Sequence, residues 1–191
     1  MNLIFATNND NKAKEIQHLI GNSYTIKILK DIGCTEDIEE TGKTLHENAS
    51  IKSNYVTNHF KINCFADDTG LLVDALNGAP GVYSARYAGE QKNADDNMNL
   101  LLKNLLMIEN RTAKFVTVIS LIIDGEDFFF EGELKGKITT EKRGRNGFGY
   151  DPIFVPDSYT KTLAELSLNE KNIISHRAIA FNKLREFLSK Y

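Results

Sequence analysis

The sequence predicts an α/β protein built on one long mixed sheet flanked by helices. The chain opens with a short apolar run, a polar turn and then apolar residues at helical spacing. Capping boxes at Thr44 and Ser167 mark the starts of two helices. In the second half, an Asp-Gly turn joins two runs rich in β-forming residues. All 191 residues are expected to form a single domain, since no linker or repeat divides the sequence.

Composition and charge narrow the classes of function. Hydrophobic residues make up 41% and charged residues 26%, the usual balance of a globular protein. The net charge of −3 gives no sign of a nucleic-acid partner. No apolar run approaches the roughly 18 residues of a membrane helix. The cysteines Cys34 and Cys64 lie in no metal-binding spacing, which favours reduced thiols in a soluble, cytoplasmic protein.

In the first half, strands and helices are expected to alternate. Apolar residues at helical spacing follow the first turn, and the Thr44–Glu47 capping box begins a longer helix. A third apolar run ends at four polar or small residues. The expected elements are strands at 3–6, 24–29 and 62–66, a helix containing Ile16, Leu19 and Ile20, and a helix from 44 to about 59.

The second half is expected to contain a hairpin among helices. Asp124-Gly125 is a strong hairpin signal between two β-rich runs. Met98, Leu101, Leu102 and Leu105 share one face of a predicted helix. The expected elements are a helix at 94–108, strands at 115–123, 127–133 and 153–155, a helix starting at the Ser167–Glu170 capping box, and a last helix capped by Ser175. No G-x-G-x-x-G follows the first strand, so a dinucleotide-binding Rossmann fold is not expected.

The first candidate for chemistry is Thr7-Asn8-Asn9-Asp10-Asn11-Lys12, between the first strand and its helix. Asparagine tolerates left-handed backbone, and helix-start amides beside a lysine can bind phosphate. The alternative is a plain helix cap, in which Asn9 accepts a hydrogen bond from the amide of Lys12. This alternative is favoured when the segment is taken alone.

A second candidate is the segment Glu39-Glu40-Thr41-Gly42-Lys43-Thr44. Gly-Lys-Thr before a helix is similar to the end of a phosphate-binding P-loop, but that loop needs a glycine where Asp37 stands. We therefore reject a P-loop. Either Glu39 or Glu40 is a candidate metal ligand, and the alternative is a solvated acidic turn.

Asp67-Asp68-Thr69-Gly70 directly follows the third expected strand. Carboxylates at the carboxyl end of a strand lie where α/β proteins bind ligands. Magnesium takes one or two carboxylates together with phosphate oxygens and water. A carboxylate here could also accept a proton from an attacking water. The alternative is an Asx-turn that ends the strand.

Two segments near the C-terminus could hold a flat ligand. Gly147-Phe148-Gly149-Tyr150-Asp151-Pro152 places aromatic residues between glycines, where a ring could stack on a base. Ser175-His176-Arg177 opens the last helix, with Lys171 shortly before it. Basic residues at a helix N-terminus oppose the helix dipole, which indicates an anionic or carbonyl-rich ligand. The alternative is an ordinary His–Arg pair at the surface.

The order of these motifs resembles that of a known family. T-x-N-x-x-K, E-E-T-G-x-T-x-x-E-N-A, A-D-D-T-G, G-A-P-G-V-Y-S-A-R-Y, G-F-G-Y-D-P and S-H-R follow one another along the chain. This series resembles the Ham1-like inosine triphosphate pyrophosphatase family (dITP/XTP pyrophosphatases) from residue 2 to the final helix. The resemblance implies the inosine triphosphatase-like fold, with two lobes and the active site in the cleft. It also implies a Mg²⁺-dependent homodimer that hydrolyses non-canonical purine nucleoside triphosphates (ITP, dITP, XTP) to monophosphate and pyrophosphate.

The same resemblance implies roles for individual residues. Asp68 would be the catalytic proton acceptor, and Glu40 and Asp68 would hold magnesium. Asn8 and Asn11 stand where glycine is frequent in the family, and Thr69 where serine is common, but each replacement keeps the needed backbone or hydroxyl. The substrate-binding residues would be Thr7, Asn8, Asn9, Asp10, Asn11, Lys12, Lys52, Thr69, Phe148, Gly149, Tyr150, Asp151, Lys171, His176 and Arg177.

The chemistry that follows is an in-line attack of water on the α-phosphorus, with the metal and lysines neutralising the leaving pyrophosphate. His176 and Arg177 would donate hydrogen bonds to the 6-oxo group of hypoxanthine, whereas the 6-amino group of adenine is itself a donor and would be opposed. One alternative is a pyrophosphatase of the Maf type, which acts on pyrimidine or methylated triphosphates. Another is a nucleotide-binding regulator without turnover, which the intact Glu40 and Asp68 disfavour.

Overall fold

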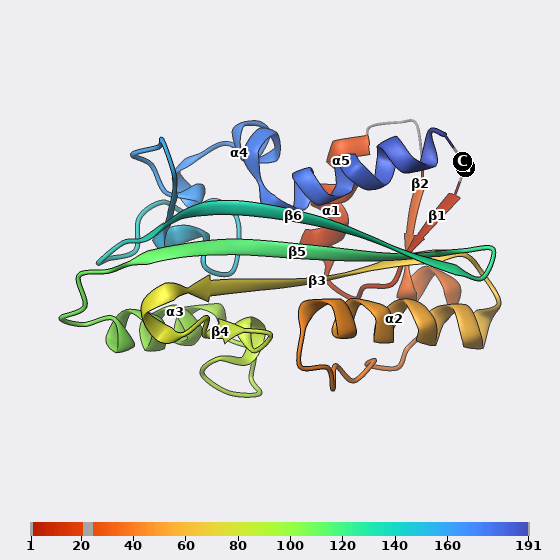
Figure 1. Cartoon of the computed structure of the whole chain (residues 1–191), viewed down its shortest axis with the longest axis horizontal. Helices are drawn as coiled ribbons and strands as arrows, with labels where there is room; N and C mark the ends of the chain where they lie inside the picture. The colour runs from red at the N-terminus through yellow and green to blue at the C-terminus, as the bar shows by residue number, and fades with distance from the viewer. Residues whose placement is uncertain (1, 21–24, 191) are drawn as a thin grey trace. The chain divides into compact units, whose positions relative to one another are not determined.

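The computed structural model describes residues 2–20 and 25–190 of the chain. These residues form two compact units (Figure 1). Unit 1 comprises Met1–Asp68, Thr117–Gly132 and Arg177–Tyr191, and unit 2 comprises Thr69–Val116 and Glu133–His176. The chain therefore passes between the units several times, and three of its strands contribute residues to both.

The first five strands and α-helices of the described residues alternate, the later ones also follow in runs of one kind, and the sheet is mixed. The strand order is β2-β1-β3-β5-β6-β7, with β4 paired to β3. Strand β1 runs parallel to β2 and β3, whereas β3–β4 and β6–β7 are antiparallel pairs. The predicted α/β class with a mixed sheet flanked by helices is confirmed; the two-lobed arrangement around a cleft stays a prediction. The elements are β1 Asn2–Phe5, α1 Asp10–Ile20, β2 Thr25–Ile28, α2 Leu45–Phe60, β3 Cys64–Val73, β4 Pro80–Gly81, α3 Ala94–Asn104, β5 Thr112–Ile123, β6 Glu126–Ile138, β7 Phe154–Pro156, α4 Leu168–Ile174 and α5 His176–Leu188.

In unit 1, the sheet separates two hydrophobic clusters. Side chains alternate between the faces of a strand, so Phe65 lies on one face of β3 and Ala66 on the other. Phe5 and Phe65 stack with ring centroids 4.6 Å apart and pack with Ile16 of α1 and Phe181 of α5. On the opposite face, Ala66 packs with Val56 of α2. Figure 1 shows the same arrangement, with α1 and α5 on one side of these strands and α2 on the other.

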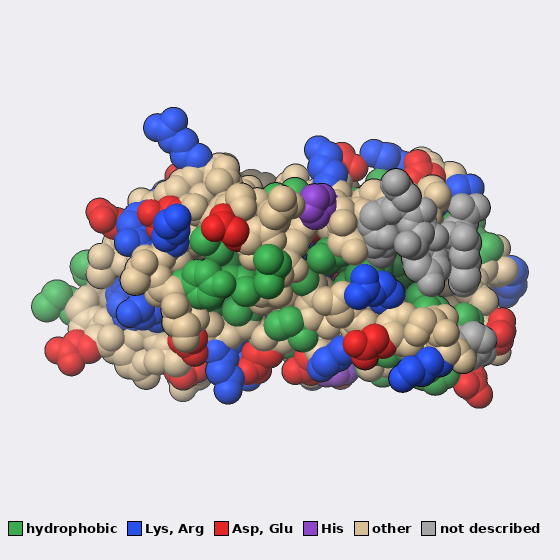
Figure 2. Space-filling model, turned by 90° about the horizontal axis from the view of Figure 1, so that it is seen from above, with side chains coloured by type: hydrophobic (Ala, Val, Ile, Leu, Met, Phe, Trp, Pro, Cys, Tyr) green, Lys and Arg blue, Asp and Glu red, His purple; other side chains and the backbone are tan. Residues whose placement is uncertain are grey.

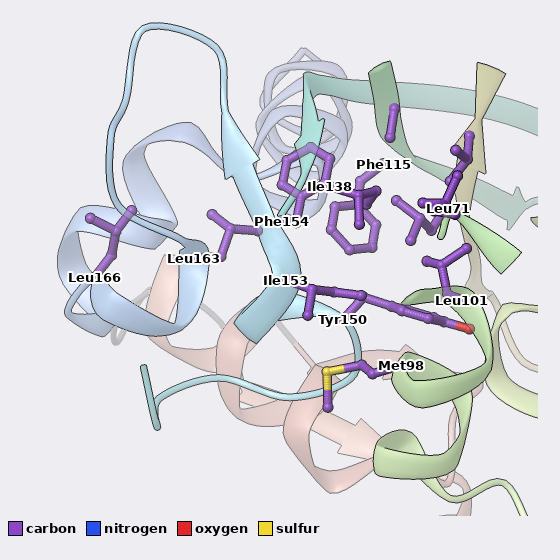
Figure 3. Packing of buried hydrophobic residues seen from close by; sticks show 13 residues of the cluster. Leu71, Met98, Leu101, Phe115, Ile138, Tyr150, Ile153, Phe154, Leu163 and Leu166 are labelled. Carbon is purple, nitrogen blue, oxygen red and sulfur yellow. The ribbon is translucent and has the colours of Figure 1, made fainter. Parts of the chain in front are cut away.

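Unit 2 has its own core, in which strands β3, β5, β6 and β7 pack with α3 (Figure 3). Phe115 of β5 and Phe154 of β7 meet with ring centroids 4.7 Å apart. Leu101 of α3 is fully buried in the same cluster. Each unit therefore has the buried apolar contacts to hold its polar residues in fixed positions.

Several predicted boundaries are confirmed and others are wrong. Both capping boxes form, at the starts of α2 and α4. The Asp124-Gly125 turn has positive φ at both residues, as a tight hairpin requires. Helix α3 ends at Asn104 instead of Ile108, and Met107 in the turn that follows adopts left-handed backbone with φ of +67°. Of the strand expected at 24–29, β2 covers Thr25–Ile28, and Tyr24 lies outside the described residues.

The prediction that β3 ends before Asp67 is wrong. The strand continues through Asp67, Asp68, Thr69 and Gly70 to Val73, so these residues form neither a strand end nor an Asx-turn. Polar residues fit inside a buried strand here because ionic partners from distant segments satisfy them. The two carboxylates therefore have positions fixed by the sheet.

The surface carries mixed charge. On the face drawn in Figure 2, Lys and Arg side chains are interspersed with Asp and Glu side chains around green apolar areas. Within residues 2–20 and 25–190, no helix has the length and apolar character needed to cross a bilayer.

Candidate active site

The consecutive carboxylates Asp67 and Asp68 point to opposite faces of β3. Asp67 shares its face with Phe65 and meets Lys12 of α1, whose Nζ lies 2.9 Å from Oδ1. Asp68 shares its face with Ala66 and meets α2, since Asn48 donates a hydrogen bond of 3.1 Å to Oδ2. The period of two in a strand thus gives two adjacent aspartates separate sets of partners.

On the α1 and α5 face, Asp67 belongs to a buried chain of ion pairs. Its Oδ2 lies 3.7 Å from Nε of Arg177, and Arg177 also pairs with Glu15 of α1. Burial alone would raise the pKa of Asp67, but Lys12, Arg177 and Lys52 outweigh it and lower that pKa to about 2. Burial lowers the pKa of Lys12, partly opposed by Asp67. Asp67 is therefore an anion that holds two cations in place.

On the α2 face, Lys52 gathers two carboxylates. Its Nζ pairs with Glu40 and lies 3.9 Å from Oδ1 of Asp68. Burial raises the pKa of Asp68, assisted by the charge of Glu40 and opposed by Lys52. The pKa of Lys52 is raised, because Asp68 and Glu40 outweigh the effect of burial. Asp68 is thus the more basic of the two adjacent aspartates.

Glu40 and Asp68 have the donor chemistry of a magnesium site. Both offer hard carboxylate oxygens, and both already converge on one cation, the ammonium of Lys52. In the part of the chain that the structure describes, no three His, Cys, Asp or Glu side chains gather as a protein-only metal cage. Two carboxylates suit magnesium, which completes its shell with phosphate oxygens and water. The residues present therefore fit the ion.

The segment from Thr7 to Lys12 forms a capped helix start. The side chain of Asn9 accepts hydrogen bonds of 3.0 and 3.1 Å from the amides of Asn11 and Lys12, so the predicted cap is confirmed. The side chains of Asn8 and Asn11 are exposed. Asp10 is also exposed and pairs with Lys30 at 3.0 Å. Phosphate binding by this loop stays a prediction, and only Lys12 points from it to the buried carboxylates.

The segment 39–44 before α2 both caps that helix and supplies Glu40 to the cluster with Lys52 and Asp68. Thr44 and Glu47 exchange capping hydrogen bonds, in keeping with rejection of a P-loop. Glu39 is exposed, whereas Glu40 pairs with Lys52, so the geometry favours Glu40 as the ligand. The amide of Gly42 donates a 2.8 Å hydrogen bond to Oδ1 of Asn48. The turn is therefore tied to the same residue that holds Asp68.

In unit 2, Asp151 organises the turn that carries Phe148. The buried carboxylate accepts hydrogen bonds from the amide of Phe148 at 2.8 Å and from Nζ of Lys171 at 2.7 Å. The ammonium of Lys171 lies 4.8 Å from the centre of the Phe148 ring, a cation–π contact. Gly147 has φ of +74°, and a Cβ there would lie 2.0 Å from the Asp151 carboxylate. The predicted residues Phe148, Asp151 and Lys171 therefore form one cluster.

The remaining predicted residues have mixed positions. Tyr150 is buried in the unit 2 core (Figure 3), and its hydroxyl donates a hydrogen bond of 2.9 Å to the carbonyl of Ser84. His176 is buried and stacks on Phe115, with ring centroids 4.8 Å apart. Thr69 lies half-buried in β3, and Gly149 has open space around it. Lys171 belongs to the last turn of α4, so it is not part of the α5 N-terminus.

Three buried polar residues were not assigned a role from the sequence. Asn48 and Glu15 fall inside predicted helices, where each has the pattern of an ordinary helix residue, and the sequence does not distinguish Asp67 from Asp68. A signal was available for Asn48, because it falls within the E-E-T-G-x-T-x-x-E-N-A motif. The partners of Asp67 and Glu15 are far away in sequence, and only the fold brings them together.

Comparisons with known proteins agree on one family. The sequence model of the Ham1 family matches residues 3–187. The chain is 57% identical over 189 residues to the dITP/XTP pyrophosphatase of Flavobacterium johnsoniae, covering 99% of this chain and 98% of the relative. It is 54% identical over 190 residues to the dITP/XTP pyrophosphatase of Christiangramia forsetii, with both chains fully covered. The solved structure of the Staphylococcus aureus Ham1 protein matches with a TM-score of 0.90 and 42% identity, covering 100% of this chain and 99% of that one.

Proposed function

The chain belongs to the Ham1 family, and on that premise we propose that it hydrolyses non-canonical purine nucleoside triphosphates to the monophosphate and pyrophosphate. Its relatives are named dITP/XTP pyrophosphatases and match over nearly their whole length. The observation that carries the proposal is the placement of Asp67 and Asp68 next to each other on β3 with separate partners. Asp67 pairs with Lys12 and Arg177, whereas Asp68 faces Lys52, which also pairs with Glu40. ITP, dITP and XTP are the proposed substrates.

Two buried or part-buried lysines, Lys12 and Lys52, would bind the triphosphate. Lys12 is held by Asp67, and Lys52 is held by Glu40 and Asp68. A fixed cation stabilises charge that develops on a leaving pyrophosphate without first having to reorganise. The backbone and side chains of Thr7–Asn11 would contact the same phosphates, together with the Thr69 hydroxyl.

We propose Mg²⁺ as the cofactor, held by Glu40 and Asp68. When bound, it would polarise the phosphoryl oxygens and neutralise part of their charge. The protein's own contribution is to bring two hard carboxylates of different segments toward one cation.

Asp68 would orient the attacking water and take its proton. Its carboxylate is buried on β3, its pKa is raised by burial, and one oxygen is fixed by Asn48. Since a bound magnesium would lower that pKa, holding the water in position would contribute more than the basicity of the carboxylate. The attack would be in line at the α-phosphorus, so that pyrophosphate leaves as one unit.

Residues of the turn that carries Phe148 would hold the base, and hydrogen-bond donors would recognise it. Phe148 could stack on a purine, and Asp151 and Lys171 fix the turn that carries it. Gly149 leaves room beside that ring, and Tyr150 anchors the turn in the core. His176 and Arg177 would donate to a 6-oxo group. Adenine would meet these donors with its own 6-amino donor and bind poorly.

The proposal also covers assembly and location. A symmetric homodimer is expected from the family resemblance and from the exposed aromatic residue in G-A-P-G-V-Y-S-A-R-Y, Tyr83. Both cysteines are free and buried, as suits a reducing compartment such as the cytoplasm.

The experiment that tests the function is product analysis with purified protein and magnesium. ITP should yield IMP and pyrophosphate, whereas dTTP and methylated UTP should yield neither product. Release of inosine diphosphate and phosphate would contradict cleavage at the α-phosphorus. Equal turnover of the pyrimidine triphosphates would favour the Maf type of activity instead.

A further inference from the structure

Asn48 is a fully buried polar residue on the first turns of α2. Its side chain has two polar ends, and both are engaged. Oδ1 accepts a hydrogen bond of 2.8 Å from the amide of Gly42, and Nδ2 donates a hydrogen bond of 3.1 Å to Oδ2 of Asp68. One side chain therefore links the turn after Glu40 to the proposed proton acceptor on β3.

The orientation of this amide follows from chemistry. A backbone N–H can only donate, so the oxygen of Asn48 must face Gly42. An ionised carboxylate can only accept, so the nitrogen must face Asp68. Aspartate or leucine has the size of asparagine, but neither offers both an acceptor and a donor.

The turn is shaped to reach Asn48. A Cβ on Gly42 would lie 2.6 Å from Oδ1 of Asn48 and 2.6 Å from Cβ of Glu47. Only glycine lets the backbone come this close to the helix. The helix start is itself fixed by the Thr44–Glu47 capping box, so the turn and Asn48 form one rigid corner.

The two oxygens of Asp68 then face different groups. Asn48 holds Oδ2, while Oδ1 faces Lys52 at 3.9 Å. A carboxylate held at one oxygen cannot rotate about its Cβ–Cγ bond without breaking that hydrogen bond. The other oxygen is thereby kept on the side where Glu40 and Lys52 meet.

We propose that Asn48 is a positioning residue, which fixes the rotation of the Asp68 carboxylate and ties the Glu40 turn to it. This inference rests on the proposed function, because the positioned group is its proton acceptor. Partners of this kind around catalytic or metal-binding carboxylates typically contribute about 10- to 100-fold to activity. The expected effect is on kcat, since Asn48 itself touches no substrate in this account.

Asn48→Asp is the main variant, because it keeps the size and the acceptor toward Gly42 and replaces the donor toward Asp68 with a second carboxylate oxygen, whose charge repels that of Asp68. It should lower kcat for ITP by about 10- to 100-fold while changing KM by less than about 3-fold. The matched control is Ser53→Ala on the same helix, where Ser53 is also fully buried and hydrogen-bonds Ser120 at 2.7 Å. That control should lower Tm but leave kcat near that of the wild type.

A Tm cycle tests the pairing without activity. In Asn48→Asp combined with Asp68→Asn, the amide and carboxylate exchange places, so Tm should recover most of what Asn48→Asp alone loses. This readout also decides the matter if the single variant unfolds at the assay temperature.

Wild-type kcat in folded Asn48→Asp, or no recovery of Tm in the double variant, would overturn the positioning role. Absence of ITP hydrolysis by the wild-type protein would instead overturn the proposed function and leave the Tm cycle informative.

Discussion

Two neighbouring aspartates on one strand do different work because alternate residues face opposite sides of a sheet. Asp67 holds Lys12 and Arg177 against α1 and α5, and its pKa falls to about 2. Asp68 faces α2, and burial raises its pKa. A sequence read residue by residue sees only Asp-Asp, because the cations that separate their roles lie 55 positions before Asp67 and 110 after it.

The first prediction concerns turnover. Asp68→Asn should lower kcat for ITP by at least about 100-fold at saturating magnesium, because an amide cannot take a proton and binds the ion weakly. Tm should change little, since the amide keeps the size of the side chain. The measurement is steady-state pyrophosphate release together with thermal unfolding. A kcat of Asp68→Asn close to that of the wild type would contradict a role of Asp68 in the reaction.

The second prediction separates two adjacent glutamates. Glu40→Gln should raise the magnesium concentration needed for half-maximal activity by about 10- to 100-fold, because a ligand is lost. Glu39→Gln is the control, since Glu39 is exposed and Glu40 pairs with Lys52. A magnesium titration of the two variants decides the point. Equal shifts in both would argue for general electrostatics around the turn.

The third prediction is the pH dependence of stability. The pKa of Asp67 is about 2 in the folded protein and 3.8 in the ordinary reference state. The ionised Asp67 carboxylate therefore stabilises the folded protein fully above about pH 4, and this contribution to the free energy of unfolding is lost as the pH falls toward 2. In denaturant unfolding from pH 5 to 2, the gap between wild type and Asp67→Asn should shrink by about 2 kcal/mol. A gap that stays constant would show that Asp67 does not titrate in this way.

At the scale of elements, the sequence predicts best what is set by local interactions. The capping boxes at Thr44 and Ser167 and the Asp124-Gly125 turn are read from neighbours and form as expected. The end of β3 was mispredicted because polar residues usually end a strand, and here buried ion pairs override that rule. The 3-10 helices at 84–86 and 151–153 carry no comparable signal.

The fourth prediction distinguishes the turn whose Phe148 would stack on the base from the helix whose Arg177 would recognise the base by hydrogen bonds. Phe148→Ala should weaken ITP and ATP alike and leave their kcat/KM ratio nearly unchanged, because stacking is blind to base identity. Arg177→Lys should lower the ratio by at least about 10-fold, because it keeps the charge beside Glu15 and Asp67 but removes the planar donor fork. Steady-state kinetics with both substrates provide the test. If Phe148→Ala lowered the ratio and Arg177→Lys left it unchanged, both assigned roles would be wrong.

At the scale of the whole molecule, two compact units share three strands and each contains its own core. The sequence predicted the class and the mixed sheet from local patterns. Local patterns could not predict the division into units, because each unit is assembled from separated stretches of the chain, and only the family resemblance implied two lobes. For the candidate site, sequence motifs predicted which residues take part, whereas only the fold shows which of them pair with one another.

The fifth prediction is the oligomeric state. Tyr83 is 57% exposed, and the guanidinium of Arg86 lies 5.2 Å from its ring centre. A dimer that covers this aromatic residue should sediment at about twice 21.5 kDa at micromolar concentration. Tyr83→Glu should favour the monomer, whereas Tyr159→Glu, at another exposed tyrosine, should not. A wild-type protein that sediments only at 21.5 kDa would contradict the dimer.

The central claim, that the protein removes non-canonical purine triphosphates, is tested most directly by comparing kcat/KM for ITP and ATP in the wild-type protein with magnesium. Donors that meet the 6-oxo group oppose the 6-amino group of adenine, and such a mismatch can reach about 10⁴-fold. We expect ITP to be preferred by at least about 100-fold, with pyrophosphate as the product. Equal kcat/KM values for ITP and ATP would contradict the claim.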